Sequence, residues 1–198
     1  MTTASPMPDV LRLVLDTSLF TNPDTARQWG EGARAALEGF VAQAKDRRGR
    51  LECYMPPLVC DELKTFVGDS AMPGDFELVV QLKSPNRYRI EVPGFLLYEL
   101  IDDIRGRIDR GLRVAEKAVR DTHPTNVDRT IARLREQYRS VLRSGLLDSK
   151  EDVDLILLAQ ELDAALISSD RGVVTWAEKL GIRLIHPDKL RGLLDELG

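Results

Sequence analysis

The sequence has few of the residues that build disulfides, zinc sites or Cys/His active sites. Its 198 residues include two Cys and two His, and aromatic residues make up 6%. Cys53 and Cys60 stand seven positions apart with no third cysteine, which fits neither a disulfide framework nor zinc ligation. His123 and His186 are distant from each other in the chain. These absences argue against zinc chemistry and against Cys/His nucleophilic catalysis.

Long apolar stretches are also missing. No apolar run approaches the ~20 residues that a membrane-spanning helix needs, and residues 1–10 lack a basic segment followed by an apolar one. We therefore expect no membrane partner, no secretion and a cytoplasmic location. The length and the 43% hydrophobic content suit one globular domain with an added element. Residues 1–9 are expected to form a flexible tail.

Charge is unevenly distributed along the chain. The net charge of −4 argues by itself against a nucleic-acid partner. Residues 104–144, however, contain 11 basic and 5 acidic residues, a net charge of +6, which leaves −10 for the remainder. Ten of the 11 are Arg, whose planar guanidinium suits phosphate, although Arg-rich helices are also common as solvated faces. The candidate RNA-binding residues are Arg105, Arg107, Arg110, Arg113, Lys117, Arg120, Arg129 and Arg133.

Short apolar runs alternate with helical patterns, which predicts an α/β fold with a mostly parallel central sheet flanked by helices. Strands are expected at residues 11–15, 51–55, 88–92, 165–168 and 183–185. Helices are expected at residues 23–44, 58–66, 76–82, 150–162 and 173–180.

Residues 95–144 have a different pattern, with apolar residues at helical spacing on both sides of a turn at residues 121–126. The spacing predicts two long helices that form a projecting antiparallel hairpin, inserted into a domain made of residues 10–94 and 145–198. The apolar seam either closes on itself or packs against another copy, and we favour self-association because an isolated helix pair buries little core. The seam consists of Leu97, Ile101, Ile104, Ile108, Leu112, Ala115 and Val119, followed by Val127, Ile131, Leu134, Tyr138 and Val141.

Six acidic residues are expected at the carboxyl edge of the sheet, where open α/β sheets bind ligands. Asp16 ends the first strand, and Asp170 follows the strand at 165–168. The others lie on, or just before, two helices that begin at this edge. The full set is Asp16, Glu62, Asp148, Asp152, Asp154 and Asp170.

Each of these acids has a simpler alternative role. Asp170 could only open a turn, and Ser149 with Asp152 resembles a helix capping box. Convergence favours a site, because carboxylates gathered at one edge repel one another without a cation. Oxygen ligands without His or Cys are the preference of Mg²⁺ or Mn²⁺. Such a site can activate water and stabilise charge at a phosphodiester.

Four motifs in order resemble the PIN-domain nucleases, small α/β proteins whose carboxylates hold Mg²⁺ or Mn²⁺ and that cleave RNA. The motifs are Leu13–Ser18, the helix with Glu62, Asp154–Ala159 and Ile167–Asp170. A narrower resemblance covers Pro93–Ile101, Arg110–Arg120 and Asp148–Leu155, which are similar to the minimal protein-only RNase P of the HARP type.

The narrower resemblance implies removal of the 5′ leader from precursor tRNA, which leaves a 5′ phosphate on the mature tRNA. It also implies that no catalytic RNA subunit is needed and that hairpins pair protomers into homo-oligomers that grip the tRNA. Asp16, Asp148, Asp152 and Asp170 are then the catalytic residues. The metal ligands are Asp16, Asp152 and Asp170, with Asp154 and Glu62 carried over from PIN domains in general.

Two other functions remain open at this stage. One is a toxin-like PIN ribonuclease with another RNA target. The other is a non-catalytic scaffold that holds an RNA-processing assembly together through its hairpin.

Overall fold

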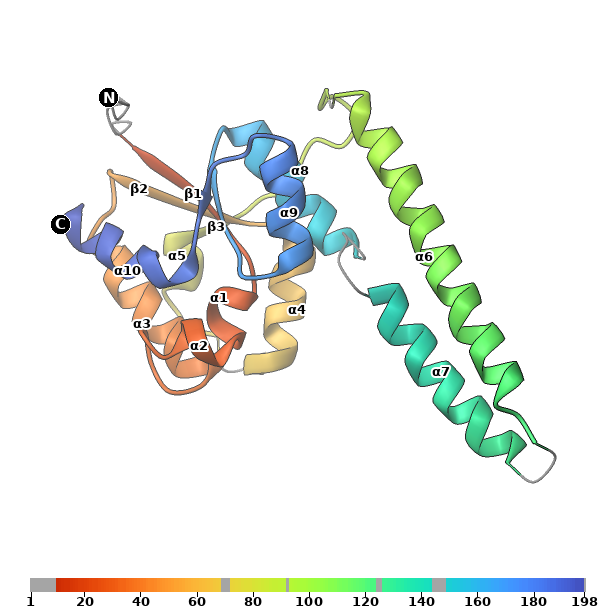
Figure 1. Cartoon of the computed structure of the whole chain (residues 1–198). Coiled ribbons are helices and arrows are strands. Elements are labelled where there is room, and N and C mark those ends of the chain that lie inside the picture. Colours follow the sequence, from red (N-terminus) through yellow and green to blue (C-terminus); the bar gives the residue numbers. More distant parts are fainter. Residues whose placement is uncertain (1–9, 69–71, 92, 124–125, 144–148, 198) are drawn as a thin grey trace, which may run out of the picture. The chain divides into compact units, whose positions relative to one another are not determined.

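The computed structural model describes residues 10–68, 72–91, 93–123, 126–143 and 149–197 (Figure 1). The chain divides into two compact units, the first formed by residues 1–90 and 149–198 and the second by residues 91–148. The first unit contains the sheet, and the second contains two long helices.

The sheet of the first unit is entirely parallel among the described residues, with strand order β3-β2-β1-β4-β5. Because all strands point the same way, their carboxyl ends lie along one edge. This confirms the predicted parallel α/β fold. The strands are β1 (Leu11–Leu15), β2 (Leu51–Met55), β3 (Val80–Leu82), β4 (Ala165–Ile167) and β5 (Leu184–Ile185).

The central strand β1 pairs with β2 and β4, so Leu13 lies between Cys53 and Ala165. Consecutive residues at the end of β1 are buried, which requires that both faces of the sheet are covered. The helices of this unit are α1 (Ser18–Thr21), α2 (Pro23–Ala26), α3 (Ala33–Lys45), α4 (Pro57–Val67), α5 (Phe76–Val79), α8 (Lys150–Leu162), α9 (Arg171–Lys179) and α10 (Pro187–Glu196).

Three element predictions were wrong. The helix expected at residues 23–44 is two helices, because the chain turns between α2 and α3 and passes through Gly32 at φ +84°. The strand expected at 88–92 does not form in residues 88–91, since residues 87–89 make a turn. The strand next to β2 is instead β3, which lies within the stretch 76–82 that was expected to be helical. Helix α10 was not predicted.

The second unit consists of α6 (Phe95–Arg120) and α7 (Val127–Arg143), which are in contact. Gly111 in α6 lies against Tyr138 in α7, whereas Asp121 at the end of α6 binds Arg133 near the start of α7. This pairing shows that the two helices run antiparallel. In the part of the chain that the structure describes, no helix combines the length and apolarity needed to cross a membrane.

The face of α6 that packs on α7 is not the expected apolar seam. Gly111 and Ala118 are buried, and Gly111 lies against Tyr138 of α7. The seam residues are centred about 70° around the helix from these two residues at 3.6 residues per turn. We call the exposed seam residues of α6 the apolar stripe, and their exposure ranges from 48% to 74%. The apolar stripe consists of Leu97, Ile101, Ile104, Ile108, Leu112 and Val119.

We predict that Gly111→Val loosens the hairpin. A Cβ at Gly111 would lie 2.6 Å from Cε2 of Tyr138, so the ring of Tyr138 has to leave its place against α6 or the two helices have to move apart. Hydrogen exchange of the α6 and α7 amides should become faster, while exchange in the sheet stays the same. Gly106→Val is the matched control, because a Cβ there meets only the flexible end of Arg110, at 3.3 Å. Equal exchange in the two variants would contradict the prediction.

Candidate active site

Asp16 is the buried centre of a hydrogen-bond network at the carboxyl edge of the sheet. Its Oδ2 accepts hydrogen bonds from Ser18 Oγ and Ser168 Oγ, each at 2.6 Å. Each serine oxygen in turn accepts a backbone N–H at 3.0 Å, from Ser169 to Ser18 and from Asp170 to Ser168. These backbone donors leave each serine proton to point at Asp16. The carboxylate is therefore held in one orientation through Oδ2.

The other oxygen of Asp16 lies beside Glu62. Thr17 Oγ1 is 3.3 Å from Asp16 Oδ1 and 3.2 Å from Glu62 Oε2. A hydroxyl carries one proton, so it can donate to only one of the two carboxylates at a time. Glu62 comes from α4, which follows β2, and Asp16 follows the neighbouring strand β1. The structure thus brings together two of the predicted site residues.

Asp170 caps α9, and its charge also acts on Asp16. Its Oδ1 accepts the backbone N–H groups of Gly172 at 2.7 Å and Val173 at 3.0 Å. The simpler role weighed from the sequence was that of a turn residue, and the structure makes Asp170 the N-cap of α9 instead. This role does not remove Asp170 from the cluster, because the negative charge of Asp170 acts on Asp16 as well.

Burial and repulsion both disfavour the charged forms of this cluster. Burial raises the pKa of Asp16 above its usual value, and the hydrogen bonds from Ser168 and Ser18 oppose that rise. Burial likewise raises the pKa of Glu62, with the hydrogen bond from Thr17 opposing it and the charge of Asp16 adding to it. A cation bound between these carboxylates would stabilise their ionised forms.

Helix α8 carries the remaining acids. Ser149 Oγ caps this helix by accepting the backbone N–H of Asp152 at 3.0 Å, so Asp152 lies in its first turn. Asp148 lies outside the described residues. Glu151 was not predicted, yet its charge contributes to the raised pKa of Glu62. Its place in the first turn of α8, next to Asp152, was the available sequence signal.

Asp154 is bound by an arginine. Its side chain is 2% exposed, and Arg87 donates from Nε to Asp154 Oδ1 at 2.9 Å and from Nη2 to Oδ2. Both carboxylate oxygens are engaged in this ion pair. The structure therefore places Asp154 against Arg87, which sequence reasoning did not single out.

The donor chemistry of the cluster fits a divalent metal. Asp16, Glu62 and Asp170 offer oxygen ligands, the type that Mg²⁺ and Mn²⁺ prefer. Among the described residues, a range that excludes 144–148, no group of three His, Cys, Asp or Glu is already arranged to hold a metal ion. Asp148 belongs to the excluded segment, just before the helix with Asp152.

Comparisons with known proteins identify the family. The family model of the PINc domain ribonucleases matches residues 12–197. The RNA-free ribonuclease P of Pyrococcus abyssi is 48% identical over 190 residues, which cover 95% of this chain and 93% of that protein. This chain belongs to the RNA-free ribonuclease P family. PIN nucleases in general use divalent metal ions, in keeping with the oxygen donors of the cluster.

Relatives from distant organisms show the same extent of similarity. The RNA-free ribonuclease P of Thermococcus onnurineus is 49% identical over 189 residues, covering 94% of this chain and 95% of that protein. That of Alkalilimnicola ehrlichii is 46% identical over 189 residues, covering 94% and 97%. Matches of this length include the α6–α7 segment as well as the sheet unit.

The candidate RNA-binding residues all lie on α6 and α7. Four of them recur at steps of 3, 4 and 3 and are exposed, so they form one basic face of α6. This face lies on the far side of the helix from the apolar stripe. We call it the basic face, and it consists of Arg110, Arg113, Lys117 and Arg120.

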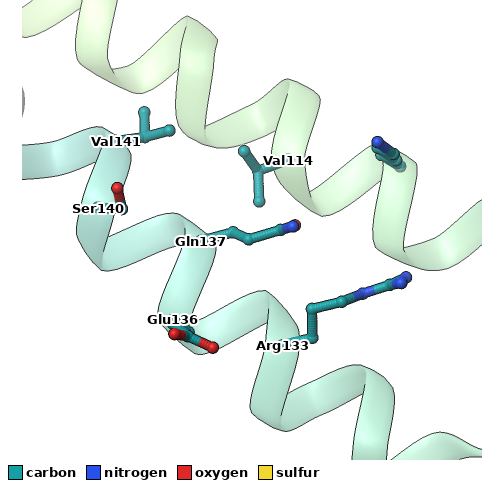
Figure 2. Close-up of a pocket in the computed structure, with 7 residues that line it drawn as sticks. Val114, Arg133, Glu136, Gln137, Ser140 and Val141 are labelled. Atoms are coloured by element: carbon teal, nitrogen blue, oxygen red, sulfur yellow. The ribbon is translucent and has the colours of Figure 1, made fainter.

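Other candidates surround two hollows of the hairpin. A groove of about 550 Å³ between the helices is lined by Lys117 and Arg133 among others, and Figure 2 shows Val114 and Arg133 pointing into it from opposite helices. Arg129 and Arg133 line a second hollow of about 350 Å³ at the turn, where Arg133 binds Asp121 at 3.0 Å.

Two arginines of α6 differ in their surroundings. Arg105 is exposed. Arg107 has a buried Nε and Nη2, and neither atom has a hydrogen-bond partner among the residues that the structure describes.

We predict that Asp16→Asn stabilises the metal-free protein at neutral pH. The raised pKa of Asp16 means that its charge costs stability as pH rises from the unfolded-state pKa through the folded-state pKa. The neutral amide avoids that cost, and it can accept from Ser18 and Ser168 while donating toward Glu62. We expect a Tm increase of about 2–4 °C, the shift that ~1 kcal/mol gives in a chain of this size.

Thermal unfolding in EDTA at pH 5 and pH 8 measures this effect. The gain should be larger at pH 8 than at pH 5, because the ionised fraction of a carboxyl group with a raised pKa increases with pH. A variant that is less stable than the parent at both pH values would show that the charge of Asp16 is favourable on its own.

Proposed function

We propose that this chain is an RNA-free ribonuclease P, an endoribonuclease that removes the 5′ leader of precursor tRNA and leaves a 5′ phosphate on the mature tRNA. The similarity to proteins of that name across both units carries the proposal. The carboxylate cluster supports it, because it supplies the oxygen donors that a PIN nuclease needs. No catalytic RNA subunit takes part, and we place the reaction in the cytoplasm.

The active site is proposed to consist of Asp16, Asp148, Asp152 and Asp170, with Glu62 as a further ligand. A bound divalent ion, Mg²⁺ or alternatively Mn²⁺, would activate water and stabilise the negative charge that develops on the phosphodiester. Asp16 is held through Oδ2 by two serines, which leaves Oδ1, on the side of Glu62, as its ligating atom.

Proton transfer in this proposal does not use histidine. The chain has only His123 and His186. His186 caps α10, and His123 follows the end of α6. The carboxylates at the carboxyl edge therefore orient the attacking water themselves.

The hairpin is proposed to bind the tRNA and a second copy of the chain through different faces of α6. The basic face carries four exposed cations at helical spacing, a pattern suited to successive phosphates. Arg105, Arg107, Arg129 and Arg133 extend the positive charge on the same two helices. The apolar stripe is left uncovered by α7, and its period of 3 and 4 residues is that of a helix that packs on another helix.

We predict that Asp16→Asn abolishes cleavage of a labelled precursor tRNA in Mg²⁺. The matched control is Asp61→Asn, because Asp61 is next to Glu62 in the sequence but is exposed and pairs with Lys64 on α4. The control should cleave at the parent rate and at the same junction. A toxin-like ribonuclease would instead cut the RNA elsewhere, and a scaffold would bind it without any metal-dependent cut. Cleavage by Asp16→Asn at the parent rate would contradict the assignment of the site.

We also predict that the two faces of α6 can be disabled separately. Arg113→Glu with Lys117→Glu should weaken tRNA binding and make its dependence on log salt less steep, with the oligomer unchanged. Ile104→Ser with Ile108→Ser should reduce the mass measured by light scattering. A parent protein that is strictly monomeric at micromolar concentration would remove the reason for the apolar stripe.

A further inference from the structure

We propose that Asp154 is the buried half of an ion pair with Arg87 that fixes the rotation of α8. Of the two acids Asp152 and Asp154, only Asp152 then serves the metal site. This inference rests on the proposed metal-dependent function. It reverses the expectation that Asp154 is a metal ligand, which came from PIN domains in general.

Helix geometry separates the two acids. Residues two positions apart on an α-helix point about 160° away from each other, so Asp152 and Asp154 cannot both face one ion. Asp154 faces Arg87, which uses both of its oxygens. Because both oxygens of Asp154 are engaged by Arg87, the proposed metal site takes its α8 ligand from Asp152 instead.

The ion pair is one of two anchors along the same face of α8. Glu161 is seven residues after Asp154, which places it on the same face two turns away. It accepts from Lys83 Nζ at 2.7 Å and from the backbone N–H of Asn86 at 2.6 Å. The segment that follows β3 is thus attached to α8 at both Glu161 and Asp154.

These anchors act on the helix that carries Asp152. Two attachments about 10 Å apart along one face prevent α8 from turning about its axis. Asp154 is almost fully buried, whereas the side chain of Arg87 is 51% exposed. Removing the arginine would therefore leave a buried carboxylate without a counter-charge, which is far more costly than removing both partners.

Four variants test the inference on metal-free protein titrated with Mn²⁺ by calorimetry. They are Asp152→Asn, Asp154→Asn, Arg87→Met and the double variant Arg87→Met with Asp154→Asn. We expect Asp154→Asn to keep the Mn²⁺ Kd within about threefold of the parent, because the amide oxygen that replaces the carboxylate can still accept from Arg87. Asp152→Asn should weaken Mn²⁺ binding by about tenfold or more. A loss of that size is typical even when a residue that hydrogen-bonds to a metal ligand is changed.

Thermal unfolding of the same variants gives a second readout. Arg87→Met should lower the Tm by several degrees, and the double variant should recover part of that loss because the unpaired buried charge is gone. If Arg87→Met does not fold, the comparison of Asp152→Asn with Asp154→Asn decides alone. The inference is overturned if Asp154→Asn weakens Mn²⁺ binding as much as Asp152→Asn does. It is also overturned if the Tm loss of the double variant equals the sum of the losses of Arg87→Met and Asp154→Asn. No readout depends on tRNA cleavage, so a different RNA target would leave the result intact.

Discussion

The need to hold a buried carboxyl group at the end of β1 organises the first unit. Asp16 sits where burial opposes its ionisation, and two serine hydroxyls supply the compensating hydrogen bonds. Those serines come from α1 and from the end of β4, so Asp16 joins parts of the chain that are 152 residues apart. The sheet order, with β1 between β2 and β4, is what makes this meeting possible.

The second unit is governed by a different constraint, the division of the surface of α6 into three faces. The contact with α7 uses small residues, Gly111 and Ala118, which lets the helices approach closely. The large apolar residues and the cations are then free to occupy the other two faces. A hairpin that packed through its large apolar residues would have had no exposed stripe to offer.

The sequence was sufficient for the parallel sheet, because β1, β2 and β4 are apolar runs bounded by clear turn or helix signals. It was insufficient for β3, since three residues at the sheet edge carry too little pattern to differ from a helix end. The long helices were visible from their periodicity. The face of α6 that contacts α7 was not, because its buried residues Gly111 and Ala118 carry almost no hydrophobic signal.

The candidate site, too, could be predicted from the sequence only in part. The positions of Asp16 and Asp170 follow from the strand ends, so both could be expected at one edge. The partner of Asp154 could not, because Arg87 lies in an irregular segment with no periodicity, 67 residues away in the chain. The hydrogen bonds of Ser18 and Ser168 could not be predicted either. Each serine donates to Asp16 and accepts a backbone N–H, and the sequence pattern does not show where those N–H groups point.

The pairing of β1 with β4 has a consequence for the order of events during synthesis. The register of Leu13 with Ala165 cannot form until the ribosome has released nearly the whole chain. The α6–α7 pair depends on contacts between near neighbours in the sequence and can form earlier. A growing chain therefore has its basic helices before its carboxylate cluster is assembled.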